Sequence, residues 1–115
     1  MRKVTQSAAQ ALKNQKTFKS GNTRVDALVD ELLYGLYLHG NKIAEYDAVT
    51  GNIYISDCGW RTNTTKERIN GILQTFGIPA HIYQKDYNWF LGYKDVSVLW
   101  TGEYSFSVSQ PLINQ

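Results

Sequence analysis

The fold is decided by residues 64–79, which read TTKERINGILQTFGIP. Thr64 and Glu67 have the spacing of a capping box. In this motif the threonine side chain accepts a hydrogen bond from the backbone amide of the glutamate, and the glutamate side chain accepts one from the backbone amide of the threonine. Apolar residues then recur on one helix face, at Ile69, Ile72, Leu73 and Phe76. Gly77 stands where a helix-ending glycine is expected, and Pro79 prevents continuation. The stretch therefore predicts one amphipathic helix whose apolar stripe packs on a sheet.

Two further elements are clear upstream of this helix. Residues 4–14 carry apolar side chains at helical spacing and predict a short helix capped by Thr5 or Ser7. Residues 42–47 and 52–57 alternate apolar and polar side chains around a Thr-Gly-Asn turn. This alternation predicts a β-hairpin.

Residues 23–38 fit two patterns. Their leucines and valines follow the spacing of an amphipathic helix, whereas the end of the stretch is equally rich in strand-forming residues. Gly35 argues against a helix running through the whole segment. We therefore expect an irregular or helical stretch to about Leu33 and a strand through Leu38.

The chain after Pro79 has the pattern of paired strands. Residues 80–85 and 88–93 predict one hairpin, and residues 96–101 and 103–109 predict another around a glycine turn. The tail at 111–115 is expected to be frayed.

The order helix, strands, helix, strands is typical of an α+β fold. We expect an antiparallel β-sheet packed by one central amphipathic helix and a short N-terminal helix. The 115 residues are near the commonest size of one domain, so the range 1–115 is predicted to be a single domain.

The composition argues against several classes of function. A lone cysteine, Cys58, forms no internal disulfide and indicates a reducing compartment. It ends a predicted strand, where a small buried thiol packs well, so we do not expect a nucleophile. Cys58, His39 and His81 lack the paired spacing of metal ligands. We expect no enzyme activity, no metal and no cofactor. No apolar run is long enough to span a membrane, which predicts a cytoplasmic protein.

Charge is unevenly distributed along the chain. The net charge is +2, but residues 1–25 contain six basic residues and no acidic residue. Residues 26–57 contain six acidic residues and one basic residue. Such a pattern fits either a polyanion-binding surface or pairing of the two blocks with each other.

Two sets of residues are candidates for binding. For a protein partner, we consider large aromatic and arginine side chains near loops, because these residue types contribute most of the binding energy at interfaces. They are Trp60, Arg61, Tyr87 and Trp89. For nucleic acid, the basic candidates are Lys13, Lys16, Lys19, Arg61, Lys66 and Arg68. The segment 83–89 also alternates aromatic and basic residues, as a base-stacking strand does, although an amphipathic strand packing on the helix has the same pattern.

Three stretches together resemble small accessory proteins encoded by tailed bacteriophages. They read LHGNKIA at 38–44, GWRTNTTKERIN at 59–70 and IYQK at 82–85 with Trp89 following. The resemblance spans about residues 1–91, and the hairpin and tail at 92–115 look like an addition. It implies a phage protein acting inside a bacterium, and a shared fold more than a shared site.

The leading hypothesis is a non-enzymatic phage accessory protein that binds and modulates a bacterial host or defence protein. The alternative is a small nucleic-acid-binding domain that uses the basic N-terminal segment and the helix start at 61–68. Exposed sheet edges are also compatible with a homodimer.

Overall fold

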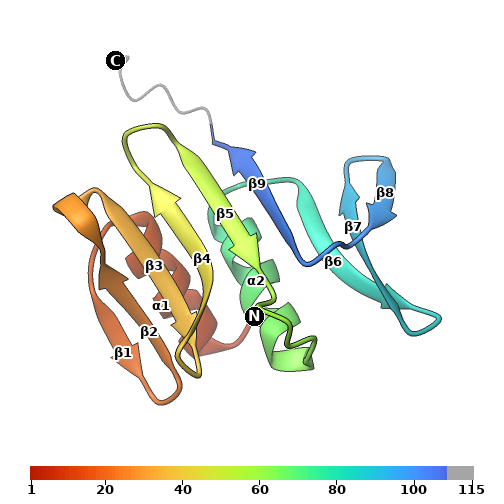
Figure 1. Ribbon diagram of the computed structural model, residues 1–115, viewed down its shortest axis with the longest axis horizontal. Coiled ribbons are helices and arrows are strands. Elements are labelled where there is room, and N and C mark those ends of the chain that lie inside the picture. Colours follow the sequence, from red (N-terminus) through yellow and green to blue (C-terminus); the bar gives the residue numbers. More distant parts are fainter. Residues whose placement is uncertain (109–115) are drawn as a thin grey trace.

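The computed structural model describes residues 1–108 as an α+β fold (Figure 1). Its elements follow one another as α1 (Lys3–Lys13), β1 (Phe18–Ser20), β2 (Thr23–Ala27), the short 3-10 helix η1 (Val29–Glu31), β3 (Leu33–Leu38), β4 (Asn41–Asp47), β5 (Asn52–Ser56), α2 (Asn63–Thr75), β6 (Ala80–Lys85), β7 (Asn88–Tyr93), β8 (Val96–Leu99) and β9 (Glu103–Ser107). The predicted fold class is confirmed. The predicted tail at 111–115 lies outside the described residues.

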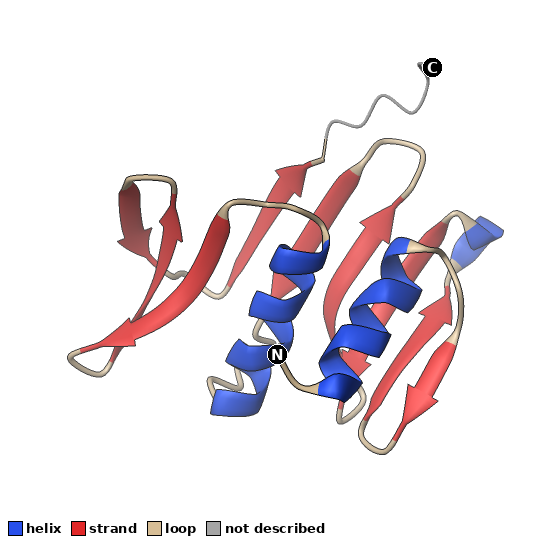
Figure 2. Cartoon of the chain, turned by 180° about the vertical axis from the view of Figure 1, so that it is seen from behind, coloured by secondary structure: helices blue, strands red, loops and turns tan. Residues whose placement is uncertain are grey.

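The strands form two antiparallel sheets. The large sheet has the order β1-β2-β3-β4-β5-β9, and the small sheet has the order β6-β7-β8. Figure 2 shows α1 and α2 side by side on one face of the large sheet. The core lies between these layers, and its fully buried side chains include Leu12, Val25, Leu36, Ile53, Ile55, Ile69, Ile72 and Leu73.

The two helices meet around a buried arginine on α2. The Arg68 guanidinium is 2% exposed; it donates to Thr5 Oγ1 on α1 at 2.7 Å and to Thr23 Oγ1 on β2 at 3.2 Å. It also pairs with the Glu67 carboxylate at 2.7 Å. A buried charge needs a partner and hydrogen bonds to offset its desolvation, and these groups provide both. Next to this network, a Cβ at Gly71 would overlap the Thr5 methyl group, so glycine permits the close approach of the helices.

The start of α2 differs from the predicted capping box. Thr62, not Thr64, is the N-cap, and its hydroxyl accepts a hydrogen bond from the Thr65 amide at 3.1 Å. Glu67 does not cap back, because its carboxylate instead accepts from Thr5, Arg68 and the Arg2 amide. The predicted N-cap was therefore wrong by two residues. Thr62 and Thr65 also stand three residues apart, and this pair precedes Thr64 and Glu67 in the chain and forms the cap. At α1 the predicted caps were also wrong: Arg2 is the N-cap without a side-chain bond, and Thr5 is buried.

The ambiguous segment 23–38 is mostly sheet. The helical interpretation was wrong for β2, whose residues pair with β3 throughout, with Val25 opposite Leu36 and Asp26 opposite Gly35. Only η1 between them is helical. The strand predicted up to Leu38 is confirmed, as are the hairpins β4–β5 and β6–β7. Long-range pairing outweighs the local helical spacing here.

The last two strands do not pair with each other. β8 pairs with β7, whereas β9 crosses to pair with β5 as the edge of the large sheet, so the predicted hairpin around Gly102 was wrong. The segment between them links the two sheets. Because Trp100 lies in that segment and is 2% exposed, the crossing is fixed by a buried aromatic side chain.

The Glu67 network gives stability a specific pH dependence. Burial alone would raise the pKa of Glu67, but hydrogen bonds from Thr5, the Arg2 amide and Arg68 outweigh it and hold this pKa below its usual value of 4.5. A carboxyl group with a lowered folded-state pKa stabilises the fold above its unfolded-state pKa and loses this effect as the pH falls through its folded-state pKa.

We therefore expect Glu67→Gln to lower the free energy of unfolding by about 1–2 kcal/mol near neutral pH. The difference from the wild-type chain should shrink as the pH falls below 4.5. Urea unfolding measured at several pH values tests this, with Glu31→Gln as a control because Glu31 is exposed. A difference that stays constant with pH would contradict the stabilising role of the ionised carboxylate.

Candidate functional site

The loop between β5 and α2 is anchored by a buried carboxylate. We refer to residues 57–62 as the Trp60 loop. Asp57 is 4% exposed; its Oδ1 accepts from the Gly59 amide at 2.7 Å, and its Oδ2 accepts from Arg61 Nε at 3.1 Å and from the Trp100 indole at 2.8 Å. The Asp57 carbonyl also accepts from the Trp60 amide. One residue therefore holds the backbone amides of Gly59 and Trp60 and the side chain of Arg61.

The backbone of the Trp60 loop turns through two residues with positive φ, Cys58 at 52° and Gly59 at 85°. The Cys58 amide donates to Ser56 Oγ at 3.0 Å, and its thiol donates to the Lys42 carbonyl at 3.0 Å. Cys58 is exposed, so the expectation of a buried thiol was wrong. The tight turn brings the thiol out of the core and directs the chain toward α2.

A pocket of about 410 Å³ lies beside this loop. Its lining consists of Leu38, His39, Asn41, Ile43, Asp57, Trp60, Thr62, Thr64 and Thr65. We call it the Trp60 pocket. The floor is apolar, because Leu38 and Ile43 are core residues of β3 and β4. The rim is polar, and Trp60 is 61% exposed although its backbone is fixed. The volume is within the range of small binding pockets, which combine apolar walls with a few polar groups.

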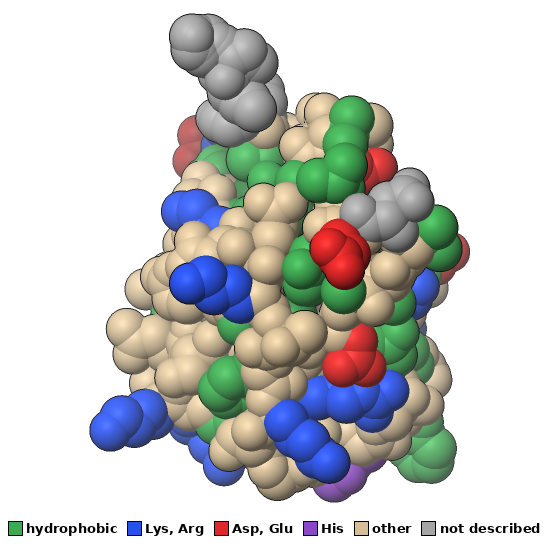
Figure 3. All heavy atoms as spheres, turned by 90° about the vertical axis from the view of Figure 1, so that its left-hand side faces the viewer, with side chains coloured by type: hydrophobic (Ala, Val, Ile, Leu, Met, Phe, Trp, Pro, Cys, Tyr) green, Lys and Arg blue, Asp and Glu red, His purple; other side chains and the backbone are tan. Residues whose placement is uncertain are grey.

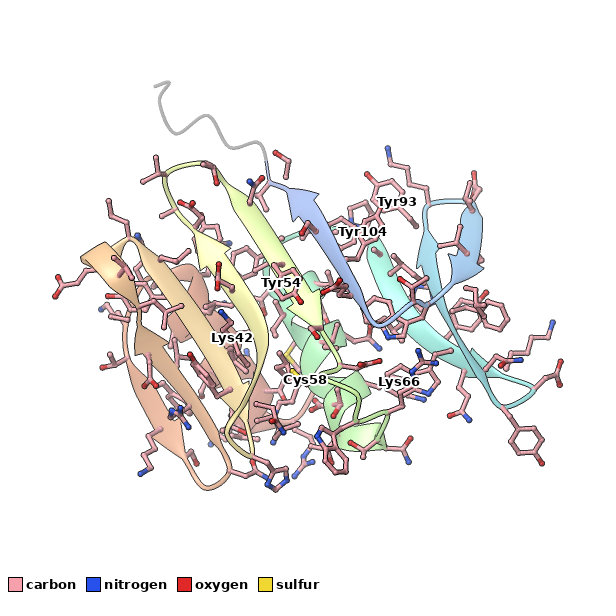
Figure 4. All side chains as sticks on the ribbon, in the orientation of Figure 1. Lys42, Tyr54, Cys58, Lys66, Tyr93 and Tyr104 are labelled. Atoms are coloured by element: carbon pink, nitrogen blue, oxygen red, sulfur yellow. The ribbon has the colours of Figure 1, made fainter. Side chains whose placement is uncertain are left out.

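Two cations lie over one buried aromatic ring beside the Trp60 loop. The Arg61 guanidinium carbon is 5.9 Å from the centre of the Trp89 ring, and Lys66 Nζ is 5.6 Å from it. These distances suit cation–π interactions. Arg61 is also paired with Asp57, whereas Lys66 forms no ion pair with any side chain that the structure describes. Figure 4 shows Lys66 near the start of α2, on the side of the small sheet.

The structure brings together some of the residues proposed for a protein partner and separates others. Trp60 and Arg61 lie in the Trp60 loop. Trp89 contacts both cations but is only 3% exposed, so its ring is not available to a partner in this conformation. Tyr87 is 96% exposed at the tip of the β6–β7 hairpin and does not line the Trp60 pocket.

The candidate stacking strand is split by a turn. Asp86 and Tyr87 form the turn of the β6–β7 hairpin, both with positive φ. Trp89 pairs with Gln84 and Tyr83 pairs with Phe90, so Tyr83 and Trp89 face opposite sides of the small sheet. The prediction of one continuous aromatic and basic face was therefore wrong.

The basic candidates also fall into two groups. Arg68 is buried against Thr5 and Glu67 and has no free face for a phosphate. Lys13, Lys16 and Lys19 are exposed, and none forms an ion pair within the described residues. The expected pairing of the basic and acidic blocks is limited there to Arg24 with Asp26.

An apolar groove of about 470 Å³, which was not predicted from the sequence, lies between the small sheet and β9. It is lined by Leu91, Tyr93, Val96, Val98, Tyr104, Ser105, Phe106 and Ser107, none of which is charged. Tyr93 and Tyr104 lie close to each other there in Figure 4. The period-two spacing of the two valines, and of Tyr104 and Phe106, was a usable signal. Because residues 96–101 and 103–109 were predicted to pair with each other, this spacing was not interpreted as an apolar surface shared by two sheets.

The outer face of the large sheet, away from the helices, is polar. Lys42 pairs with Glu45 at 2.5 Å, and this hydrogen bond raises the pKa of Lys42. Tyr54 donates to Glu103 Oε1 at 2.5 Å, and this bond and partial burial raise the pKa of Tyr54. Both shifts favour the protonated forms at neutral pH, which is typical of a solvated face rather than of a general base.

A protein-family model described as Kyanoviridae Gp96 protein matches residues 1–108. The chain belongs to this family. It is therefore a phage protein, as the sequence resemblance implied, and the matched range of the Kyanoviridae Gp96 family runs through β8 and β9. No curated protein and no solved structure matches the chain. Within residues 1–108, no helix is long and apolar enough to cross a membrane.

The hydrogen bonds that the Asp57 carboxylate accepts lead to a prediction about the stability of this member of the Gp96 family. We expect Asp57→Ala to lower the free energy of unfolding by about 3 kcal/mol, because it leaves the buried Trp100 indole without an acceptor and Arg61 without its ion pair. Trp100→Phe removes the hydrogen bond of the indole alone, so it should lower the free energy of unfolding by less, about 1.5 kcal/mol.

Urea unfolding at neutral pH measures both effects. The matched control is Asp95→Ala, because Asp95 is exposed and should change stability by no more than about 0.5 kcal/mol. An Asp57→Ala chain as stable as this control would show that the carboxylate does not anchor the loop.

Proposed function

We propose that this Gp96-family chain is a non-enzymatic phage accessory protein that binds and modulates a bacterial protein through the Trp60 pocket. The observation that carries the proposal is an exposed tryptophan, Trp60, on a backbone held by Asp57 at the edge of an apolar pocket of about 410 Å³. Interface energy concentrates in such aromatic anchors, above all where their conformation is fixed before binding.

The cations of the Trp60 loop and of the first turn of α2, which lie over Trp89 beside the loop, favour an acidic partner surface. Arg61 lies between Trp60 and Thr62 in the Trp60 loop, and Lys66 follows Thr65 in α2. Asp57, the acidic residue of the lining, is buried and already accepts three hydrogen bonds. The complementary ligand is an apolar side chain flanked by carboxylates on a bacterial protein, because opposite charges steer association and set orientation. A host-cytoplasmic partner fits a phage protein that acts during infection.

Substitution of Trp60 tests this function. We expect Trp60→Ala to abolish capture of the partner from a nuclease-treated bacterial lysate, since removal of an interface tryptophan typically weakens binding by about 2 kcal/mol or more. Trp60→Phe should retain part of the binding because it keeps an aromatic side chain in the pocket. The captured protein is identified by mass spectrometry, and its affinity for each purified variant is then measured by calorimetry.

Tyr87→Ala is the matched variant, because Tyr87 is an exposed aromatic residue outside the pocket lining. Loss of binding in Trp60→Ala with retention in Tyr87→Ala supports the pocket. Loss in Tyr87→Ala alone would move the binding surface to the hairpin tip and overturn the role of the pocket.

A second candidate function, nucleic-acid binding, is favoured by one observation. Lys13, Lys16 and Lys19 are exposed and free of ion pairs with the side chains that the structure describes. Figure 3, which views the side of the molecule that carries β1, shows Lys and Arg side chains along its left-hand and lower parts. A shallow hollow lined by Lys19, Arg24 and His39 lies at the ends of the β1–β2 and β3–β4 hairpins.

The triple substitution of Lys13, Lys16 and Lys19 to Gln tests this second function. If these lysines bind phosphates, the affinity for duplex DNA should fall, and the slope of log K against log salt should become less steep by about 0.9 for each phosphate that is no longer bound. The control is Lys85→Gln with Lys94→Gln, because both side chains are exposed on the small sheet. No binding of the wild-type chain to DNA or RNA at low salt would exclude this function.

A further inference from the structure

The exposed apolar side chains of the described residues concentrate on β7, β8 and β9. Five of them follow one another there: Tyr93, Val96, Val98, Leu99 and Tyr104. All four residues of β8 are exposed, including Val96 at 61% and Val98 at 50%. Tyr93, Val96, Val98 and Tyr104 line one groove, and apolar surface gathered in this way marks an interaction site on a folded domain.

β8 is an edge strand of four residues that lacks the charged side chains and prolines that usually protect an edge. Figures 1 and 2 both place it at the outer side of the small sheet, away from β1. The other unpaired edges of the described sheets carry charged side chains, namely Lys19 on β1, Lys85 on β6 and Glu103 on β9. β8 reads Val-Ser-Val-Leu and has neither a charge nor a proline. Because natural proteins guard exposed edges, an unguarded edge indicates a pairing strand.

The backbone pattern identifies which groups of β8 are available. The Trp100 amide donates to the Trp89 carbonyl at 2.9 Å, at the end of the β7–β8 ladder. Hydrogen-bonded pairs alternate along an antiparallel ladder, so Val98 and Val96 direct their backbone groups toward β7. The N–H and C=O groups of Ser97 and Leu99 therefore point away from β7, toward the open edge.

We propose that this edge pairs with a second copy of the chain, β8 to β8, around a two-fold axis at Val98. In this register Ser97 of each copy lies opposite Leu99 of the other, and each pair exchanges the backbone hydrogen bonds left open at the edge. Val98 lies opposite Val98 of the second copy at a non-hydrogen-bonded position, where side chains approach most closely. The two small sheets become one continuous sheet.

The charges beside β8 are compatible with a second copy as the occupant. Lys94 and Asp95 precede β8, and in this register they lie opposite Gly102 and Thr101 of the second copy, so no like charges meet. The same uncharged strand is donor and acceptor on both sides, which is the self-complementarity that a two-fold interface requires. The apolar rows of Val96 and Val98 from both copies then form one surface next to the groove.

This proposal is independent of the Trp60 pocket, because no residue of β8 lines that pocket. Its first test is the mass in solution. We expect the wild-type chain to have twice its monomer mass of 13.1 kDa in sedimentation equilibrium. Val98→Lys should restore the monomer mass, because two lysines would face each other at the axis. Val49→Lys, an equivalent change at an exposed valine in the β4–β5 turn, should leave the dimer intact.

Cysteine cross-linking tests the register. In a Cys58→Ser background, Val98→Cys should form a disulfide-linked dimer on mild oxidation, since non-hydrogen-bonded pairs have Cα atoms about 4.5 Å apart, within disulfide range. Val96→Cys should not, because its symmetry mate lies about 13 Å away along the paired strands. Val49→Cys controls for random collision.

Efficient linking at position 98 alone, together with a doubled mass, supports the proposal. A wild-type chain that is monomeric at all accessible concentrations overturns it. Equal linking at positions 98, 96 and 49 overturns the register, as does a Val98→Lys chain that is folded by circular dichroism and still dimeric. Capture of a bacterial protein that is abolished in Val98→Lys but kept in Val49→Lys, with a monomeric wild type, would assign the edge to a different partner.

Discussion

The carboxylate of Asp57 is the interaction on which the arrangement of this molecule most depends. It lies at the end of β5 and joins three segments that are far apart in the sequence: its own strand, the loop leading into α2, and Trp100 between β8 and β9. The two sheets share no strand; the bond to the Trp100 indole joins the crossing between β8 and β9 to the end of β5, while the bonds of Asn70 on α2 with the Ile82 backbone hold β6 to the helix layer. Charge-assisted and buried hydrogen bonds are stronger than exposed neutral ones. Moving the Asp57 carboxylate would break several of them at once, so this group holds the three segments in place.

The elements that the sequence predicted well are those whose signals are local. The α2 helix, the β4–β5 hairpin and the β6–β7 hairpin each have their periodicity and turn residues within one short stretch. The errors occur where a distant partner decides. Residues 23–27 have helical spacing, but β3 offers a pairing partner and Gly35 fits opposite Asp26. Likewise, Gly102 is compatible with a hairpin turn or with a crossing, and the burial of Trp100 against Asp57 selects the crossing.

The candidate site shows the same division. Trp60 and Arg61 were predicted as loop residues with interface character, and both lie in the Trp60 loop. Trp89 and Arg68 have the same residue types but are buried, because each is the partner of other side chains: Trp89 lies under two cations, and Arg68 joins Thr5, Thr23 and Glu67. Composition and motif spacing identify which side chains are capable of binding. They do not reveal which of them the fold uses internally, since that depends on interactions between residues more than twenty positions apart.

The two proposed surfaces are coupled through one residue. Asp57 fixes the backbone of Trp60 through Gly59, and it holds the indole of Trp100, which directly follows β8. Pairing of β8 with a second copy would therefore stiffen the strand whose end is bonded to the carboxylate that shapes the pocket. A two-fold dimer would also carry two Trp60 pockets in a fixed geometry. For an oligomeric bacterial partner, the second pocket would then bind at a high effective concentration, so a modest affinity at each pocket becomes a much tighter overall attachment. The stability of the edge and the strength of partner binding are thus expected to depend on the same carboxylate.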